Sequence, residues 1–259
     1  MKLISRLLAG AVFAASAVTA TTVHAEVRFG IMNEAYPPFF AKDASGAWKG
    51  WEIDLMNAVC VEMKETCSVV DVSWDGLIPA LQSKKFDVIW SSMSITDERL
   101  KTIDFTDKYY NTPSKLIGAK GATPGASPDA VEGKTIGIQV STVQSEYFKK
   151  YFADKAEEQT YQTLDEAFQD LAAGRIDYVF GDAIPLSDFL ATDFGKDCCS
   201  DMGDVADDPA VLGIGIGGGL RKEDTDLKAK LNAAIAAVRA SGKYDEISKA
   251  YFTFDVFGK

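Results

Sequence analysis

Residues 90–100, WSSMSITDERL, place a guanidinium where a helix normally carries acidic side chains. Arg99 falls in the first turn of a short predicted helix that starts near Thr96. The N-terminus of a helix carries partial positive charge, so a cation there costs about 0.3–1 kcal/mol. A carboxylate ligand would offset this cost by pairing with Arg99 and with the free N–H groups of the first turn. The alternative is a surface ion pair with a nearby acid such as Asp104.

A free amino acid needs an anion site and a cation site close together. Arg99 can hold the carboxylate in a bidentate pair. The ammonium group can be held by Asp182, by the main-chain carbonyl of Ser92 and by the hydroxyl of Ser94. Asp182 could instead be the helix N-cap of the following segment, AIPLSDFL, and the two roles could coexist.

Aromatic residues near predicted sheet edges could flank a ligand side chain. Tyr36, in AYPPFF, and Trp74 could sandwich a flat or aliphatic group or stack on a cation. Taken without their positions, both are more often core residues. Asn33 and Glu34 lie on the same loop as Tyr36, and one of them could meet the far end of a ligand. Glu34 would prefer a cationic end, unless it is a solvated loop acid.

An internal repeat predicts how these residues come together. Residues 74–92 and 164–182 match at a constant offset of 90, and each half reads as a short helix, a basic turn and an apolar strand. This order is typical of parallel βαβ units. Ser92 and Asp182 follow equivalent strands, at the sheet edge where open α/β folds bind ligands. We therefore expect them on opposite walls of one cleft.

The remaining periodicity predicts two α/β lobes. Residues 26–112 and 214–259 are expected to form the first lobe and residues 113–213 the second, joined by connecting strands near 113–119 and 211–217. The other expected elements are strands at 27–31, 134–140 (the first strand of the second lobe) and 211–216, helices over 53–59 and 227–238 and from 141 on with a Ser/Thr N-cap, and a loop at 121–130.

The first 25 residues read as a secretory signal peptide. Lys2 and Arg6 form a basic start, an apolar run too short to span a bilayer follows, and Val23-His24-Ala25 resembles a cleavage site. This segment carries two of the 27 lysine and arginine residues and none of the 38 acidic residues, so residues 26–259 carry a net charge of −13. That balance argues against nucleic acid and anionic membranes as partners.

Histidine and cysteine usage narrows the chemistry further. The single histidine, His24, belongs to the predicted signal, which excludes a histidine triad and histidine metal ligands from the exported protein. An oxidising compartment makes Cys60 and Cys67 a disulfide candidate, with two buried thiols as the alternative. The state of the adjacent Cys198 and Cys199 stays open, and nothing near them indicates a metal site or a reactive thiolate.

The chain closely resembles the family 3 periplasmic solute-binding proteins of polar amino acid ABC transporters, especially those for histidine, for lysine, arginine and ornithine, and for opines. The resemblance covers essentially all of residues 26–259. Its carriers include YPPF, GWEIDLMNAVC with Cys67 completing a small disulfide loop, WDGLIPALQSKKFD, SSMSITDER and GRIDYVFGD. It implies a type II periplasmic binding protein fold, with two α/β lobes, a two-strand hinge and a ligand cleft between them, in the periplasm.

The resemblance also implies roles for individual residues. Arg99 would hold the ligand carboxylate, and the segment from Thr142 to Gln144 would add second-lobe contacts to it. The family often has threonine where this chain has Val143, which removes a hydroxyl but keeps the backbone N–H. Residues in the remaining roles are Ser92, Ser94 and Asp182 around the ammonium, and Tyr36 and Trp74 beside the side chain. One extra residue between Gly30 and Tyr36 leaves open whether Asn33 or Glu34 reads the side chain.

We therefore expect a monomeric receptor, without cofactor, metal or catalytic residues, that captures an amino acid and delivers it to an inner-membrane ABC permease. A cationic amino acid or an amino-acid derivative is the expected ligand, because Glu34 favours positive charge. The alternative is a periplasmic enzyme on the same scaffold, similar to cyclohexadienyl dehydratases, since carboxylates can serve as acid or base. Against it, the cleft candidates leave no spare acid except Glu34.

Overall fold

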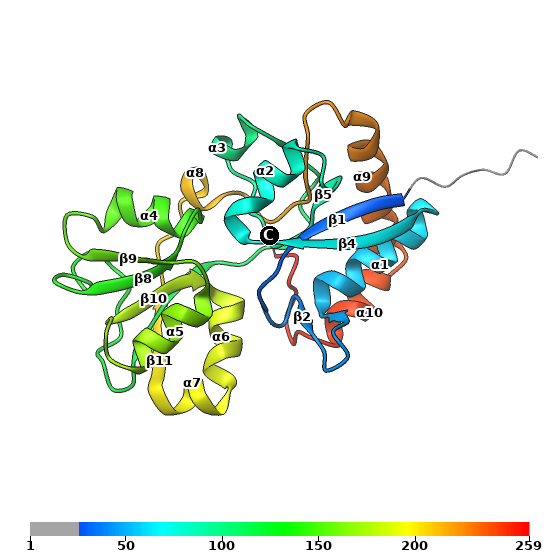
Figure 1. Ribbon diagram of the computed structural model, residues 1–259. Coiled ribbons are helices and arrows are strands. Elements are labelled where there is room, and N and C mark those ends of the chain that lie inside the picture. Colours follow the sequence, from blue (N-terminus) through cyan, green and yellow to red (C-terminus); the bar gives the residue numbers. More distant parts are fainter. Residues whose placement is uncertain (1–25, 259) are drawn as a thin grey trace, which may run out of the picture.

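The computed structural model describes residues 26–258, so the predicted signal peptide lies outside the described residues (Figure 1). Two five-stranded sheets form the centres of two lobes that lie side by side. The first sheet has the order β4 (Thr66–Val72), β1 (Glu26–Met32), β5 (Val88–Ile89), β12 (Gly219–Leu220) and β6 (Asp104–Phe105). The second has the order β11 (Cys199–Asp204), β7 (Ser114–Ala119), β10 (Tyr178–Asp182), β8 (Thr135–Gln139) and β9 (Glu157–Tyr161). A small hairpin, β2 (Ala41–Lys42) and β3 (Trp48–Lys49), belongs to the first lobe.

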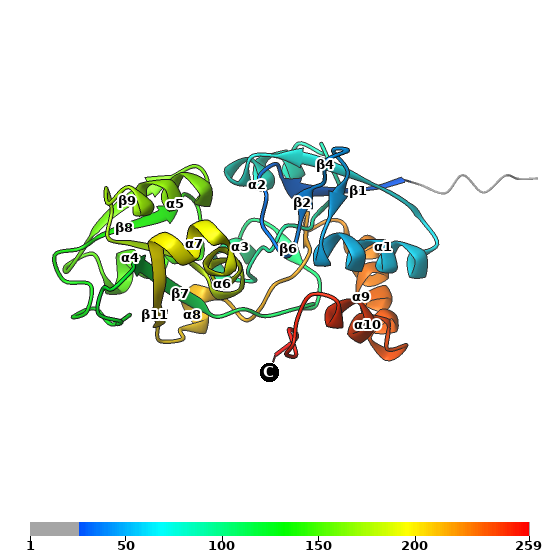
Figure 2. The same cartoon turned by 90° about the horizontal axis from the view of Figure 1, so that it is seen from below.

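Helices cover both sheets. In the first lobe they are α1 (Trp51–Met63), the 3₁₀ turn η1 (Trp74–Gly76), α2 (Leu77–Gln82), α3 (Asp97–Leu100), α9 (Thr225–Ala240) and α10 (Lys243–Lys249). In the second they are α4 (Val143–Tyr151), α5 (Leu164–Ala172), α6 (Ala183–Ala191), α7 (Asp193–Cys198) and α8 (Pro209–Leu212). Helices α1, α9 and α10 lie together on the side of the first lobe that faces away from the second (Figures 1 and 2). Among the described residues, none of these helices is long and apolar enough to cross a membrane.

The structure confirms the internal repeat. Helix α2 leads into β5 as α5 leads into β10, and β5 and β10 run parallel to β1 and β8 respectively. The sequence of buried and exposed positions is the same over residues 81–90 and 171–180. The turns also match, because Lys84 and Gly174 both have positive φ, at 61° and 67°.

An aspartate immediately precedes the strand of each repeat unit. Asp87 accepts a hydrogen bond from the main-chain N–H of Arg28 at 3.0 Å, and Asp177 accepts one from the N–H of Thr135 at 2.9 Å. Each carboxylate thereby ties its strand to the neighbouring parallel strand. The two repeat units are built by the same local contacts, which explains why they present equivalent residues at the same sheet edge.

Two chain segments cross between the lobes, one between β6 and β7 and the other between β11 and β12 (Figures 1 and 2). The expected strand at 211–216 is wrong. Helix α8 begins just before it and extends to Leu212, because Asp208 caps Ala210 and Pro209 occupies the first helical position, a strong helix-start signal. Only Ile216 makes isolated bridges within that stretch, before β12 begins. Residues 134–140 are also not the first strand of the second lobe, because β7 precedes β8 in that sheet.

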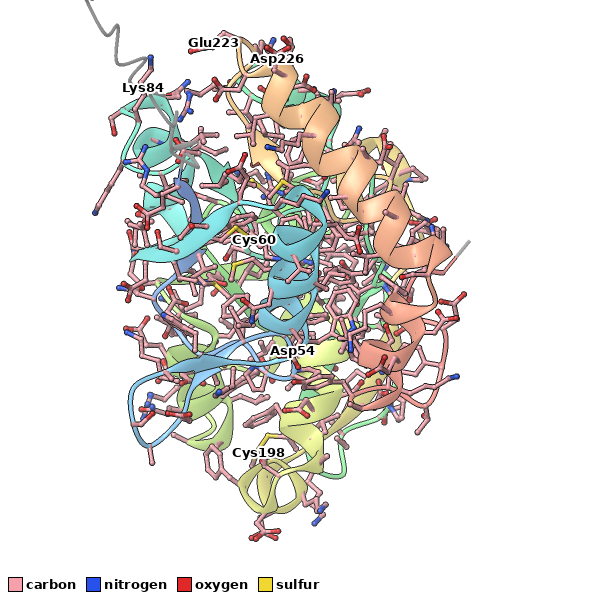
Figure 3. The ribbon with its side chains drawn as sticks, turned by 90° about the vertical axis from the view of Figure 1, so that its right-hand side faces the viewer. Asp54, Cys60, Lys84, Cys198, Glu223 and Asp226 are labelled. Atoms are coloured by element: carbon pink, nitrogen blue, oxygen red, sulfur yellow. A yellow bond between two sulfur atoms is a disulfide. The ribbon has the colours of Figure 1, made fainter. Side chains whose placement is uncertain are left out.

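Two disulfides stabilise the two lobes separately (Figure 3). The predicted bond between Cys60 and Cys67 is confirmed and joins the end of α1 to β4. The open question about the adjacent pair is answered, since Cys198 and Cys199 form a disulfide where α7 meets β11. The part of the chain that the structure describes therefore contains no free cysteine.

Candidate functional site

A cavity lined by residues of both lobes lies between them. All predicted ligand-binding residues except Asn33 and Glu34 line it. The first lobe contributes Met32, Tyr36, Trp74, Ser91, Ser92, Ser94 and Arg99, and the second contributes Gln139, Thr142, Val143, Gln144, Leu164, Phe180, Gly181 and Asp182. Strands β1, β5, β8 and β10 all end at this cavity, so the carboxyl edges of both sheets face it.

Arg99 is held in place by main-chain oxygens. Its guanidinium donates to the carbonyl of Ser94 at 2.9 Å and, across the cleft, to the carbonyl of Ser141 at 3.3 Å. It also lies 5.5 Å from the centre of the Trp74 ring. Helix α3 begins as predicted, because Thr96 is its N-cap and accepts from the N–H of Arg99. The pKa of Arg99 is lowered to about 10 by burial, which the charge of Asp182 offsets in part.

Arg99 does not form the alternative surface ion pair. Asp104 instead accepts from the ammonium of Lys228 at 2.8 Å and 2.9 Å. Within residues 26–258, every hydrogen-bond acceptor of the Arg99 side chain is a main-chain carbonyl. A guanidinium held only by neutral oxygens in a partly dry cavity favours an incoming carboxylate.

Asp182 faces Arg99 from the second lobe. It stands at the N-cap position of α6, but its side chain makes no capping hydrogen bond. One carboxylate oxygen accepts from the hydroxyl of Tyr36 at 2.7 Å and the other from the amide of Gln144 at 2.8 Å. Burial raises the pKa of Asp182, while these two hydrogen bonds and the charge of Arg99 lower it. Two hydrogen bonds leave this carboxylate with spare acceptor capacity for an ammonium group.

Aromatic rings form the side walls. Tyr36 and Trp74 are 8% and 9% exposed and both line the cavity, so each is a buried residue and a cavity wall at once. Tyr36 is supported by stacking on Phe39 and Phe40, with ring centres 5.9 Å and 5.8 Å apart. Trp90 does not reach the cavity. It is fully buried and stacks on Tyr109 at 4.2 Å, so it belongs to the core.

Glu34 and Asn33 are adjacent in the chain but lie in different surroundings. The Glu34 carboxylate accepts from the amide of Gln139 at 2.9 Å, and Gln139 lines the cavity from the opposite lobe. Burial raises the pKa of Glu34 to about 7, although the hydrogen bond from Gln139 lowers it. Asn33 is exposed and its main-chain N–H donates to the carbonyl of Val72. Glu34 is therefore the one of the two whose side chain contacts a residue that lines the cavity.

The second-lobe segment 142–144 begins helix α4. Thr142 is the predicted N-cap, accepting from the N–H of Ser145 and donating to the carbonyl of Gln139 at 2.8 Å. Val143 is 7% exposed and Gln144 is 4% exposed, and both line the cavity. The helix start therefore brings three consecutive residues to the cavity.

Sequence reasoning did not identify several lining residues. Met32 and Gln139 are the last residues of β1 and β8, so the rule that located Ser92 and Asp182 could have found them. Leu164 and Phe180 carry only an apolar signal, which does not separate a cavity wall from a core. Across residues 26–258, no group of three or more acidic, cysteine or histidine side chains is arranged to hold a metal ion.

The known proteins that this chain resembles are bacterial solute-binding proteins. The family of bacterial extracellular solute-binding proteins, family 3, matches residues 27–254. The L-arginine-binding protein of Pseudomonas aeruginosa is 43% identical over 234 residues, which cover 90% of each chain. The histidine-binding periplasmic protein of Salmonella typhimurium is 38% identical over 248 residues, 95% of each chain. A solved Salmonella typhimurium periplasmic binding protein, described for its high arginine specificity, superposes with a TM-score of 0.80 at 31% identity, covering 88% of this chain and 99% of its own.

Proposed function

The chain belongs to the bacterial extracellular solute-binding proteins of family 3 and has their type II periplasmic binding protein fold, and on that basis we propose that it captures an amino acid in the periplasm for an ABC transporter. In this role it is a monomer that delivers the ligand to an inner-membrane permease. The observation that carries the proposal is the pairing of Arg99 and Asp182, a cation and an anion on facing walls of one cavity. An α-amino acid carries the complementary charges one carbon apart.

The ligand carboxylate binds Arg99 on the first-lobe wall and the N–H groups at the start of α4, including that of Val143, on the facing second-lobe wall. The ammonium group binds Asp182 together with Ser92 and Ser94, all of which line the cavity. Hydrogen bonds to charged groups contribute roughly 1.5–3 kcal/mol each, so three or four such bonds are enough for tight binding.

The ligand side chain carries a positive charge. It passes between Tyr36 and Trp74, whose rings favour a cation, and ends near Glu34. Glu34 takes this role rather than Asn33, because its carboxylate contacts a lining residue while Asn33 is exposed. The arginine-binding and histidine-binding names of the similar proteins support a cationic amino acid as the ligand class.

Ligand binding and lobe closure are coupled. Residues 26–112 and 214–259 move as one lobe against residues 113–213, through the two crossing segments. Hydrogen bonds already join the lobes at Tyr36–Asp182, Glu34–Gln139 and Arg99–Ser141. A ligand that touches both walls adds contacts that exist only in the closed form, so it shifts the population toward that form. Binding occurs without catalysis, in keeping with the names of the relatives.

The proposal is tested on protein that has been unfolded and refolded to remove endogenous ligand. A thermal-shift panel of amino acids should raise the melting temperature with one narrow chemical class, and titration calorimetry then gives the affinity. Arg99→Ala should weaken that affinity by more than about 100-fold, because it removes two charge-assisted hydrogen bonds. Arg175→Ala is the matched control, since Arg175 is exposed and contacts Asp170 outside the cavity. Wild-type affinity in Arg99→Ala would overturn the proposal.

A further inference from the structure

Glu52 is a fully buried carboxylate that the ligand contacts proposed above do not use. It lies in the first turn of α1, at 0% exposure. One of its oxygens accepts from the main-chain N–H of Ser92 at 2.9 Å and the other from the hydroxyl of Ser92 at 2.8 Å. The hydroxyl of Tyr109 donates to the first oxygen as well. These partners are one backbone N–H and two hydroxyls, so no cation is among them.

Ser92 adopts a backbone conformation that a residue with a side chain rarely takes. Its φ is 54°, in the left-handed region, and such residues persist only where their surroundings hold them. Glu52 supplies that support, because it binds both hydrogen-bond donors of Ser92. An ionised carboxylate can only accept, so the hydroxyl hydrogen of Ser92 points toward Glu52. The lone pairs of that hydroxyl oxygen then remain for other partners, at a residue that lines the cavity and that also interacts with the hydroxyl of Tyr110.

The position of Glu52 is itself fixed by buried aromatic residues. The indole N–H of Trp90 donates to the main-chain carbonyl of Glu52 at 2.9 Å, and the Trp90 ring stacks on Tyr109. The hydroxyl of Tyr244, on α10, donates to the main-chain carbonyl of Tyr109 at 2.7 Å. Glu52 therefore joins a rigid core to the end of strand β5.

We propose that Glu52 is a positioning residue of the amino-acid site: it holds Ser92 in its left-handed conformation with the hydroxyl oxygen presented as an acceptor to the ligand ammonium. Besides Asp182 it provides a second buried carboxylate, which lies behind Ser92. The inference rests on the proposed function, because it concerns how that same ammonium site is built. It gives Trp90 a role in the site without any contact with the ligand.

The electrostatics supply a distinctive readout. Burial raises the pKa of Glu52 to about 7, while the hydrogen bonds from Tyr109 and Ser92 lower it. The other titratable groups that influence Glu52 or are influenced by it are Asp182, Tyr36 and Tyr110. A ligand ammonium stabilises the ionised carboxylate and so lowers this pKa further. Binding near neutral pH should therefore release a proton, and affinity should rise with pH up to the pKa of the free protein.

The test is titration calorimetry with L-arginine at several pH values from about 6 to about 8.5, in two buffers of different ionisation enthalpy. Glu52→Gln should bind about tenfold more weakly at the upper end of the range and should release fewer protons than the wild type near neutral pH. Tyr109→Phe keeps both hydrogen bonds between Glu52 and Ser92. It removes the hydrogen bond from the Tyr109 hydroxyl, which lowers the pKa of Glu52. It should therefore shift the pH profile of the affinity upward. Circular dichroism and the melting temperature report folding. If Glu52→Gln fails to fold, the pH profile of the affinity in Tyr109→Phe still tests the inference.

Asp54→Asn is the matched control. Asp54 lies two positions further along α1 and binds the hydroxyl of Tyr251 away from the cavity, and Figure 3 shows it on that helix. The control should leave affinity and proton release unchanged. A Glu52→Gln protein with wild-type affinity, or one with weaker binding but an unchanged pH profile and proton count, would overturn the inference. A wild-type protein that binds no amino acid in the thermal-shift panel would instead overturn the proposed function, and the inference with it.

Discussion

The hydroxyl of Tyr36 donates a hydrogen bond to the carboxylate of Asp182 at 2.7 Å across the cleft, although the two residues are 146 positions apart in the chain. Tyr36 belongs to the loop after β1 and Asp182 to the end of β10, so this bond joins the two lobes at the site itself. The group proposed to hold the ligand ammonium thus also holds the lobes together.

Removing the Tyr36 hydroxyl should loosen closure more than it weakens binding. Tyr36→Phe keeps the aromatic wall and frees one lone pair of Asp182, so the affinity should change by less than about threefold. The unliganded protein should open, which small-angle X-ray scattering would detect as a larger radius of gyration. Asp182→Asn is the contrasting variant and should weaken binding at least about tenfold, because it removes the charge that pairs with the ammonium. Equal affinity losses in both variants would contradict this separation of roles.

The selectivity for cationic ligands should depend on pH through Glu34. Burial raises the pKa of Glu34 to about 7. Below that pKa the group is neutral and cannot pair with a cationic side chain, so the preference for arginine over glutamine should fall as the pH decreases through about 7. Both ligands carry the same ammonium group, so their affinity ratio cancels any contribution from Glu52.

Competition calorimetry at several pH values measures this ratio. Glu34→Gln should give a ratio that is low and independent of pH, and Asn33→Asp should leave the ratio close to that of the wild type because Asn33 is exposed. A ratio that stays constant with pH in the wild type would remove Glu34 from the role of reading the side chain.

The two disulfides should contribute very differently to stability. The bond between Cys60 and Cys67 closes a loop with a sequence separation of 7, which corresponds to about 2–3 kcal/mol of loop entropy in the unfolded chain. The bond between Cys198 and Cys199 has a separation of 1 and closes no loop of comparable size. Replacing Cys60 and Cys67 with serine should lower the free energy of unfolding by roughly that amount, as urea denaturation would measure.

The corresponding double serine variant of Cys198 and Cys199 is the matched comparison. It should cost less than its counterpart because it removes little chain entropy. Neither pair lines the cavity, so ligand affinity should be unchanged in both variants. The prediction fails if the Cys198–Cys199 variant is the less stable of the two.

The repeat predicts a stabilising substitution at Lys84. This exposed lysine, labelled in Figure 3, has a φ of 61°, and glycine occupies the equivalent position 174 with a φ of 67°. A left-handed conformation costs a residue with a side chain about 1 kcal/mol, while glycine adopts it freely. Lys84→Gly should therefore raise the free energy of unfolding by up to about 1 kcal/mol, less the extra entropy of the unfolded chain. Gly174→Ala is the reciprocal variant, and it should destabilise the protein.

Several features follow from the sequence by itself because they depend on residues that are close in the chain. A helix starts near Thr96 as predicted, and Thr142 provides the predicted Ser/Thr N-cap of the next lobe's helix, since a hydroxyl reaches an N–H three positions away. The pairing of Cys60 with Cys67 and the equivalence of the two repeat units are local in the same way. The carboxyl-edge rule then brings Ser92 and Asp182 to one cavity.

Other features were decided only by the tertiary structure. Asn33 and Glu34 are adjacent and both polar, and only the path of the loop turns one outward and brings the other to Gln139. Glu52 reads as an ordinary acidic residue in the first turn of a helix, a position that the helix dipole favours. Its burial and its bonds to Ser92 come from a strand end 40 positions away.

The physical reason is the range of the interactions. Helix caps, turns and strand periodicity are fixed by neighbours within a few residues, so a single sequence contains enough information to predict them. The partner of a buried polar group is chosen by how distant elements pack, as in the bonds of Tyr36 to Asp182 and of Glu52 to Ser92. The residues that line this site were largely predictable from the sequence, whereas the hydrogen bonds that orient them required the assembled fold.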